Sequence, residues 1–193
     1  MALFVVVASA RSLSTSSQQL RAVWNPLSFT EPFGGSVSCS LTLEGSFHSR
    51  TLAKINYSLT GYITRAAVGT AGCTGGEVAF LSETLPWHTR YFGFEGTLPN
   101  ITRVLILISG AAFRIRNPNA VCLFTARENT TEHILGRLNR NTTTGALTSI
   151  EAGGEITSNE ACAFGLRIRG VLSGTSTSFT VLNSTERIFV RLI

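Results

Sequence analysis

The sequence predicts an all-β fold, an antiparallel β-sandwich of Greek-key or jelly-roll-like type. Over residues 36–43, apolar and polar side chains alternate with a period of two, which is typical of a strand with one buried face. Many similar short runs follow, and turn residues separate several of them. The chain is 44% apolar but only 14% charged, well below the usual charged share of roughly 25%. This composition suits many strands joined by tight turns.

The beginning of the chain is expected to lie outside the sandwich. Residues 2–10 are apolar and end in Ala-Ser-Ala, which resembles the core and cleavage site of a secretory signal, although a basic segment is missing. We therefore interpret residues 1–10 as a candidate signal-peptide remnant, with a buried first strand as the alternative. Residues 11–35 are rich in Ser, Thr and Gln and are predicted to be a mobile lead-in. The single sandwich domain then occupies residues 36–193.

Further strand-like runs follow along the chain and predict the remaining strands of the fold. They cover residues 51–57, 59–66, 77–84, 90–94, 103–109, 111–116, 120–126, 146–150, 164–171, 177–182 and 186–192. The run 103–109 is continuously apolar, so we predict a central strand that is buried on both faces. The segment 130–139 is ambiguous. Asn129 and Glu132 could cap a short helix, but Ile134–Asn139 could instead pair with Ala146–Ile150.

The four cysteines predict two disulfides. Cys39, Cys73, Cys122 and Cys162 are widely spaced, and none forms the short pair that is typical of a zinc site. An even count with a leader-like start favours an oxidising compartment. Four cysteines allow three connectivities, and we favour Cys39–Cys73 with Cys122–Cys162 because sequential pairing closes the shortest loops. Four buried free thiols are the alternative. No metal and no cofactor are predicted.

The charged residues exclude several classes of protein. The chain has no Asp and a single Lys, Lys54, against 15 Arg. Asp-dependent catalytic triads, EF-hand loops and most phosphoryl-transfer sites are therefore not expected. The longest uncharged apolar run at the start is too short for a bilayer, which needs about 20 residues, so no transmembrane segment is predicted.

The densest group of functional side chains lies between residues 84 and 101. Trp87, His88 and Tyr91 form a candidate aromatic binding patch, suited to a sugar or to a protein contact. Glu83 and Glu95 flank this block and could form the carboxylate pair of a glycosidase. The alternative is that at least half of these aromatic residues belong to the core, because side chains alternate along a strand.

Arginine also alternates with aliphatic residues in three places. If these strands share one sheet, six Arg would form a basic outer face that binds an anionic polymer or headgroup. The six residues are Arg114, Arg116, Arg167, Arg169, Arg187 and Arg191. The alternative is three unconnected strands with ordinary solvated Arg. The predicted partner is an anionic polymer or glycan of the cell envelope, and nucleic acid is not expected.

Three segments resemble an uncharacterised family of small secreted bacterial all-β proteins. They are Thr84–Ile101 (TLPWHTRYFGFEGTLPNI), Ser46–Thr51 and Arg187–Ile193. The resemblance covers roughly residues 36–193 and implies export and an all-β fold. It implies no activity, cofactor or site residue.

The sequence thus predicts an exported, non-catalytic binding or structural protein of the cell envelope or exterior. One alternative is an extracytoplasmic module that binds or hydrolyses carbohydrate. The other is a shell or coat subunit, because sandwich domains can build symmetric assemblies.

Overall fold

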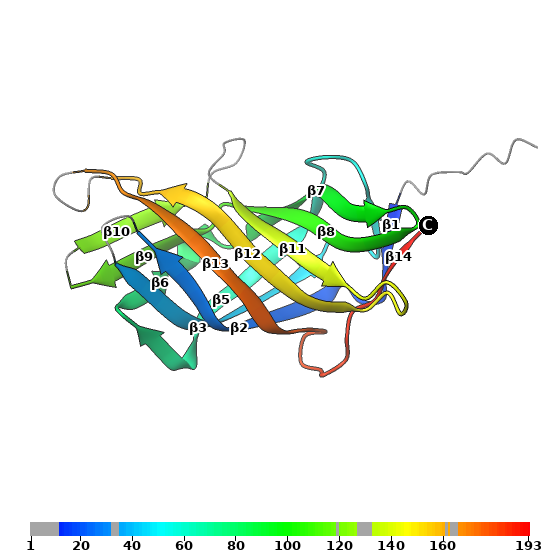
Figure 1. Ribbon diagram of the computed structural model, residues 1–193, viewed down its shortest axis with the longest axis horizontal. Coiled ribbons are helices and arrows are strands. Elements are labelled where there is room, and N and C mark those ends of the chain that lie inside the picture. Colours follow the sequence, from blue (N-terminus) through cyan, green and yellow to red (C-terminus); the bar gives the residue numbers. More distant parts are fainter. Residues whose placement is uncertain (1–11, 32–34, 119, 127–132, 161, 163–165) are drawn as a thin grey trace, which may run out of the picture.

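The central feature of the fold is a sheet of eight antiparallel strands that closes on itself as a barrel (Figure 1). The computed structural model describes residues 12–31, 35–118, 120–126, 133–160, 162 and 166–193. Around the barrel, the strands are β11 (Ile134–Arg140), β12 (Leu147–Thr157), β13 (Arg169–Thr180), β2 (Gln19–Thr30), β3 (Ser36–Phe47), β5 (Leu59–Thr74), β7 (Trp87–Thr97) and β8 (Asn100–Ser109).

Two three-stranded sheets lie at opposite ends of this barrel (Figure 1). One contains β14 (Val190–Leu192), β1 (Ser12–Thr15) and β4 (Thr51–Ala53), and we call its side the β1–β4–β14 end. The other contains β10 (Ala120–Thr125), β9 (Ala112–Asn117) and β6 (Glu77–Phe80), at the β6–β9–β10 end. A short 3₁₀ helix, η1 (Ser82–Thr84), follows β6. The prediction of an all-β, antiparallel architecture of packed sheets, as in a β-sandwich, is confirmed, and the largest sheet closes into a barrel.

Alternating side chains divide the barrel into an apolar interior and a polar exterior. On β3, Val37, Cys39 and Leu41 are buried in the core. Ser38 lies between them on the outer side, where its hydroxyl is 2.8 Å from that of Ser28 on β2. The predicted period of two is therefore correct for this strand. On β8, Leu107 is also buried although it is adjacent to the buried Ile106 and Ile108, in agreement with the predicted burial of this strand on both faces.

Both predicted disulfides are present, and both lie at the β6–β9–β10 end. Cys39–Cys73 joins β3 to β5, and Cys122–Cys162 joins β10 to the segment that precedes β13. The sequential connectivity is thus confirmed. Among the described residues, all cysteines are in disulfides.

The prediction of a mobile lead-in over residues 11–35 is wrong for residues 12–30. These residues form β1 and β2, and β2 pairs with both β13 and β3. The reason is that Leu20, Ala22 and Trp24 alternate into the core, which rewards ordering of the segment. Pro26 does not interrupt the strand because it lies at an irregularity between Trp24 and Leu27, where the missing amide hydrogen is tolerated.

Residues 134–139 are a strand and not a helix. β11 pairs with β8 on one side and with β12 on the other, so the alternative of pairing with the following strand is correct. Ile134 and Leu138 are buried in the barrel, which matches a strand period as well as a helical one over so few residues. The proposed helix cap at Asn129 lies outside the described residues.

The candidate signal-peptide remnant at residues 1–10 also lies outside the described residues. Within the described part of the chain, no helix is long and apolar enough to cross a membrane.

Candidate functional site: an apolar cavity in the barrel

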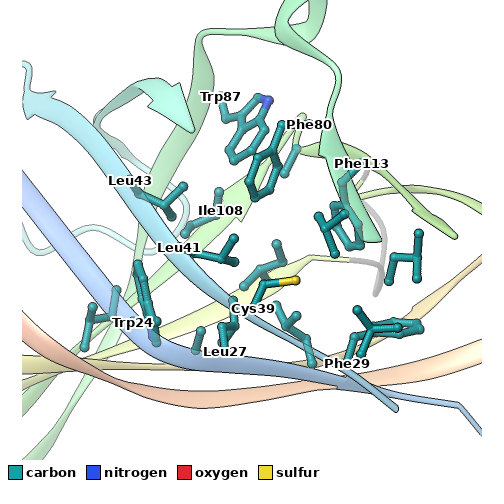
Figure 2. Close-up of a pocket in the computed structure, with 18 residues that line it drawn as sticks. Trp24, Leu27, Phe29, Cys39, Leu41, Leu43, Phe80, Trp87, Ile108 and Phe113 are labelled. Atoms are coloured by element: carbon teal, nitrogen blue, oxygen red, sulfur yellow. The ribbon is translucent and has the colours of Figure 1, made fainter. Parts of the chain in front are cut away.

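An apolar cavity lies inside the barrel, toward the β6–β9–β10 end (Figure 2). Its volume is about 50 Å³. The 18 residues that line it are Trp24, Leu27, Phe29, Val37, Cys39, Leu41, Leu43, Val78, Phe80, Trp87, Ile108, Ala111, Phe113, Ile115, Ile134, Ile150, Ala152 and Leu172. All of these side chains are apolar apart from the indole nitrogens and the disulfide sulfur.

The cavity exists because two neighbouring strands separate. β5 pairs with β7 only from Leu59 to Ile63, and the rest of β5 runs on without β7 as a partner. The gap is covered by β6, which contributes Val78 and Phe80 to the cavity wall. A short strand that covers a gap between two strands packs less completely than two strands that pair over their whole length. Space therefore remains between the barrel wall and the core.

The wall on the β6 side is an aromatic pair. The rings of Phe80 and Trp87 are 5.8 Å apart at their centroids, and Figure 2 shows them together at one side of the cavity. The indole Nε1 of Trp87 donates a hydrogen bond of 2.9 Å to Thr84 Oγ1, and that hydroxyl donates in turn to the carbonyl of Leu81 at 2.7 Å. Trp87 is thus held by η1, with its polar atom satisfied.

Trp24 forms the opposite wall, as Figure 2 shows, and its polar atom is not satisfied. The side chain is buried, with 1% of the residue exposed, and Nε1 has no hydrogen-bond partner among the described residues. Ser176, which lies opposite Trp24 in the β13–β2 register, already accepts a hydrogen bond of 2.9 Å from the amide of Ile150. A buried donor without a partner costs roughly 1–3 kcal/mol, so this atom is exceptional in a folded protein.

Two smaller cavities follow the first one along the barrel toward the β1–β4–β14 end. The second, of about 20 Å³, shares Trp24, Leu43, Ile108 and Ile150 with the first. The third, of about 10 Å³, shares Phe47, Ile106 and Leu138 with the second and reaches the β1–β4–β14 end. From the first cavity toward the β1–β4–β14 end, the interior is therefore a row of apolar spaces of decreasing volume, with the indole of Trp24 between the first two.

The predicted aromatic patch is not exposed. Trp87 and Tyr91 are 2% and 4% exposed and point into the barrel, because Trp87, Thr89 and Tyr91 occupy the inner positions of β7. His88 lies on the outer side, with its ring centroid 5.5 Å from that of Tyr62. Burial raises the pKa of Tyr91 above its usual value. The surface patch of Trp87, His88 and Tyr91 was thus a wrong prediction, and the core alternative is correct for two of the three.

The two candidate carboxylates are not brought together. Glu83 is exposed in η1, before β7 begins, whereas Glu95 lies near the far end of β7 and accepts a hydrogen bond of 2.8 Å from Arg103. Most of the length of β7 separates them. A glycosidase pair needs carboxyl groups within about 10 Å, so Glu83 and Glu95 do not form one.

The arginines do not form one continuous face. All six are exposed, and most of their aliphatic neighbours face the core as predicted: Arg114, Arg116, Arg167, Arg169, Arg187 and Arg191. Among those neighbours, however, Leu166 is 57% exposed, so the predicted alternation fails beside Arg167. Arg116 lies on β9 and Arg191 on β14, in sheets at opposite ends of the barrel (Figure 1). Arg169 forms an ion pair of 3.3 Å with Glu155. The single basic face of six residues was therefore a wrong prediction, because the three Arg strands belong to three different parts of the topology.

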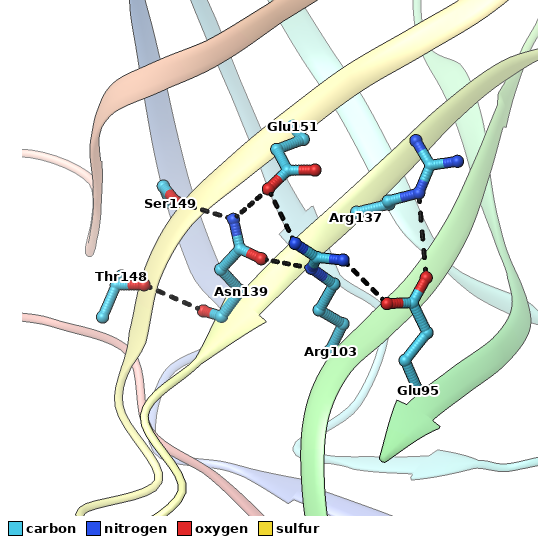
Figure 3. A network of polar contacts seen from close by, with 7 residues as sticks. All are labelled: Glu95, Arg103, Arg137, Asn139, Thr148, Ser149 and Glu151. Atoms are coloured by element: carbon cyan, nitrogen blue, oxygen red, sulfur yellow. Dashed lines mark hydrogen bonds and ion pairs between the residues drawn. The ribbon is translucent and has the colours of Figure 1, made fainter.

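A polar network on the outside of the barrel was not predicted. It joins Glu95, Arg103, Arg137, Asn139, Ser149 and Glu151 (Figure 3). Arg103 donates to Glu95 at 2.8 Å, to Glu151 at 3.2 Å and to Asn139 at 2.7 Å, so one guanidinium links β7, β8, β11 and β12. The hydrogen bond to Glu95 and the charge of Glu151 raise the pKa of Arg103. Each of its three nitrogen atoms donates to another strand of the sheet, which indicates a structural role.

Comparison with known protein families, with curated proteins and with solved structures found no match. The site is therefore interpreted from its own chemistry. Among the described residues, no three potential metal ligands lie close together, and the main cavity offers no group that titrates near neutral pH.

Proposed function

We propose that this protein is an exported, non-catalytic binding protein that holds a small apolar ligand inside its barrel. The observation that carries the proposal is the apolar cavity between Trp24 and Trp87. Closed eight-stranded barrels have an interior just wide enough to be filled by side chains or to hold one small ligand. In this barrel the side chains leave part of the interior unfilled toward the β6–β9–β10 end.

Two further observations support the proposal. Two disulfides are typical of proteins that reside in an oxidising compartment, which favours export to the cell envelope or exterior. The cavity lining lacks the acid, base or nucleophile that most enzymatic chemistry needs, which favours binding over catalysis.

The size of the cavity limits the ligand. Pockets for drug-sized ligands commonly reach about 300–1,000 Å³. A dry cavity of about 150 Å³ is enough for benzene or xenon. At about 50 Å³ the space accepts a molecule of few heavy atoms unless side chains such as Phe80 move outward. We therefore expect a small, compact ligand.

Ligand binding is tested by thermal unfolding in the presence of xenon or cyclopropane, two apolar probes smaller than benzene. A ligand at ten times its dissociation constant stabilises the folded state by about 1.4 kcal/mol, which raises the midpoint by about 4 °C for a chain of this size. Ala152→Val narrows the cavity and should remove this shift. Ala79→Val makes the same change on the exposed side of β6 and should keep it. No shift in the unmodified protein with either probe would contradict the proposal.

Export is tested separately by the mass of the protein isolated from its own source. Four cysteines that react with an alkylating reagent only after reduction would support an oxidising compartment. Four reactive thiols in the untreated protein would contradict it.

A further inference from the structure

The buried indole N–H of Trp24 indicates the chemistry of the ligand. Trp24 lines both the first and the second cavity, and its Nε1 is a buried donor without a partner in the described structure. Trp87, on the opposite wall, shows how the protein normally treats such an atom, since its Nε1 donates to Thr84 at 2.9 Å. The two tryptophans of the chain thus differ in this one respect.

A bound water molecule satisfies the Trp24 donor poorly. A buried water typically makes about three hydrogen bonds, and it needs several polar partners. The first cavity offers no hydroxyl, amide or charged side chain. The second offers one hydroxyl, that of Thr89, which accepts a hydrogen bond of 3.0 Å from Thr60, so a water beside Trp24 would have at most two side-chain partners. An acceptor atom carried on an apolar molecule fits these surroundings better than water does.

The acceptor must also be uncharged. No Lys, Arg or His side chain lines either cavity, so a carboxylate or phosphate would lose its hydration without gaining a counter-charge. A neutral carbonyl or ether oxygen needs only one good donor. The lining therefore argues against a ligand whose anionic group enters these cavities.

We propose that the ligand is a small neutral molecule that carries one hydrogen-bond acceptor, such as a ketone, aldehyde or ether, and that Trp24 Nε1 donates to this atom. The inference rests on the proposed binding function and names the class of ligand for the same cavity. Trp24 then supplies orientation, while the surrounding apolar side chains supply most of the affinity.

The test compares two small probes of nearly equal shape, acetone and isobutene, which differ in a carbonyl oxygen against a methylene group. The two indole N–H signals are followed by ¹H–¹⁵N NMR and are assigned with the Trp24→Phe variant. We expect acetone to bind about fivefold more tightly, the usual worth of one neutral hydrogen bond, and to shift the Trp24 signal downfield. Trp24→Phe should abolish that preference.

A matched variant separates the hydrogen bond from the shape of the cavity. Phe29→Leu alters the wall without removing a polar atom, so it should change the affinity for both probes by the same factor. If Trp24→Phe does not fold, the comparison of the two probes in the unmodified protein still decides the question.

The outcomes are distinguishable. Binding of both probes with equal affinity, with no movement of the Trp24 signal, would overturn the inference and leave the proposed function intact. The same result is expected if a water molecule already bridges Trp24 and Thr89. Binding of neither probe would overturn the proposed function together with the inference.

Discussion

The two ends of the barrel are closed by sheets of the same size but fastened in different ways. The β6–β9–β10 end holds both disulfides and the cavity of about 50 Å³, which Cys39 of the first disulfide lines. At the β1–β4–β14 end, the cavity shrinks to about 10 Å³, and Arg140 donates to the carbonyl groups of Val190 and Ile101 at 2.9 and 3.0 Å. Covalent links hold the end that packs less completely, whereas side-chain contacts suffice at the tighter end.

The comparison suggests why the disulfides lie where they do. Space inside a core forfeits dispersion contacts and apolar burial, so an end with a cavity is less stable than a filled one. A cross-link restores stability by restricting the unfolded chain, and it does so without filling the space. The protein thereby keeps room for a ligand at the end that the covalent links secure.

The largest effect is expected from the Cys122→Ala/Cys162→Ala double variant. The cysteines are 40 residues apart, and closing a loop of that length stabilises the folded state by about 4 kcal/mol in the chain-entropy model. Denaturant unfolding should show a loss of this size. Hydrogen exchange should show that protection falls first in β9 and β10. Equal loss of protection at the β1–β4–β14 end would break the proposed difference between the ends.

A smaller loss is expected at the other end from Arg140→Met. The substitution removes the guanidinium and leaves the carbonyl groups of Ile101 and Val190 without these donors. Hydrogen bonds from charged donors are worth about 1.5–3 kcal/mol each, but water can replace part of this at a half-buried site, so we expect a loss of about 2 kcal/mol. Burial lowers the pKa of Arg140, yet the group stays charged at neutral pH. A change below about 0.5 kcal/mol, the range of ordinary surface substitutions, would show that Arg140 does not fasten this end.

The smallest and most discriminating effect comes from adding one methylene group at each end. Val37→Ile enlarges a side chain that lines the first cavity and should stabilise the protein by about 0.8 kcal/mol. Val104→Ile makes the same change beside a space of about 10 Å³ at the other end and should destabilise the protein by about 1 kcal/mol through overpacking. Thermal unfolding of both variants shows whether each substitution raises or lowers the stability of the protein. A change in the same direction for both would mean that the two ends are packed alike.

Much of the fold follows from local patterns in the sequence. The alternation of Val37, Cys39 and Leu41 predicts β3, and the widely spaced cysteines predict the two disulfides. The alternation of Leu20, Ala22 and Trp24 equally predicts the strand β2, but Pro26 and the nearby polar residues favoured the interpretation as a mobile lead-in.

The site could be predicted only in part. The sequence identifies Trp87 and Tyr91 as unusual, but not that they face inward, because the phase of a strand depends on its partners. The cavity results from the early separation of β5 from β7, which no local pattern encodes. The orphaned N–H of Trp24 is a property of the whole interior, and therefore only the folded structure reveals it.

The closure of the barrel has a consequence for how this protein meets others. Each of the eight long strands has a strand on both sides for part of its length, but β5 beyond Ile63 pairs with β3 and not with β7. The short outer strands are also partly covered, since the amide of Val190 donates to Gly145 and the amide of Asn159 donates to Leu123. Where the barrel strands are paired on both sides, a partner protein, a second copy included, has to be recognised through side chains. Strand addition is left to the stretch of β5 beyond Ile63 and to the outer strands of the two small sheets.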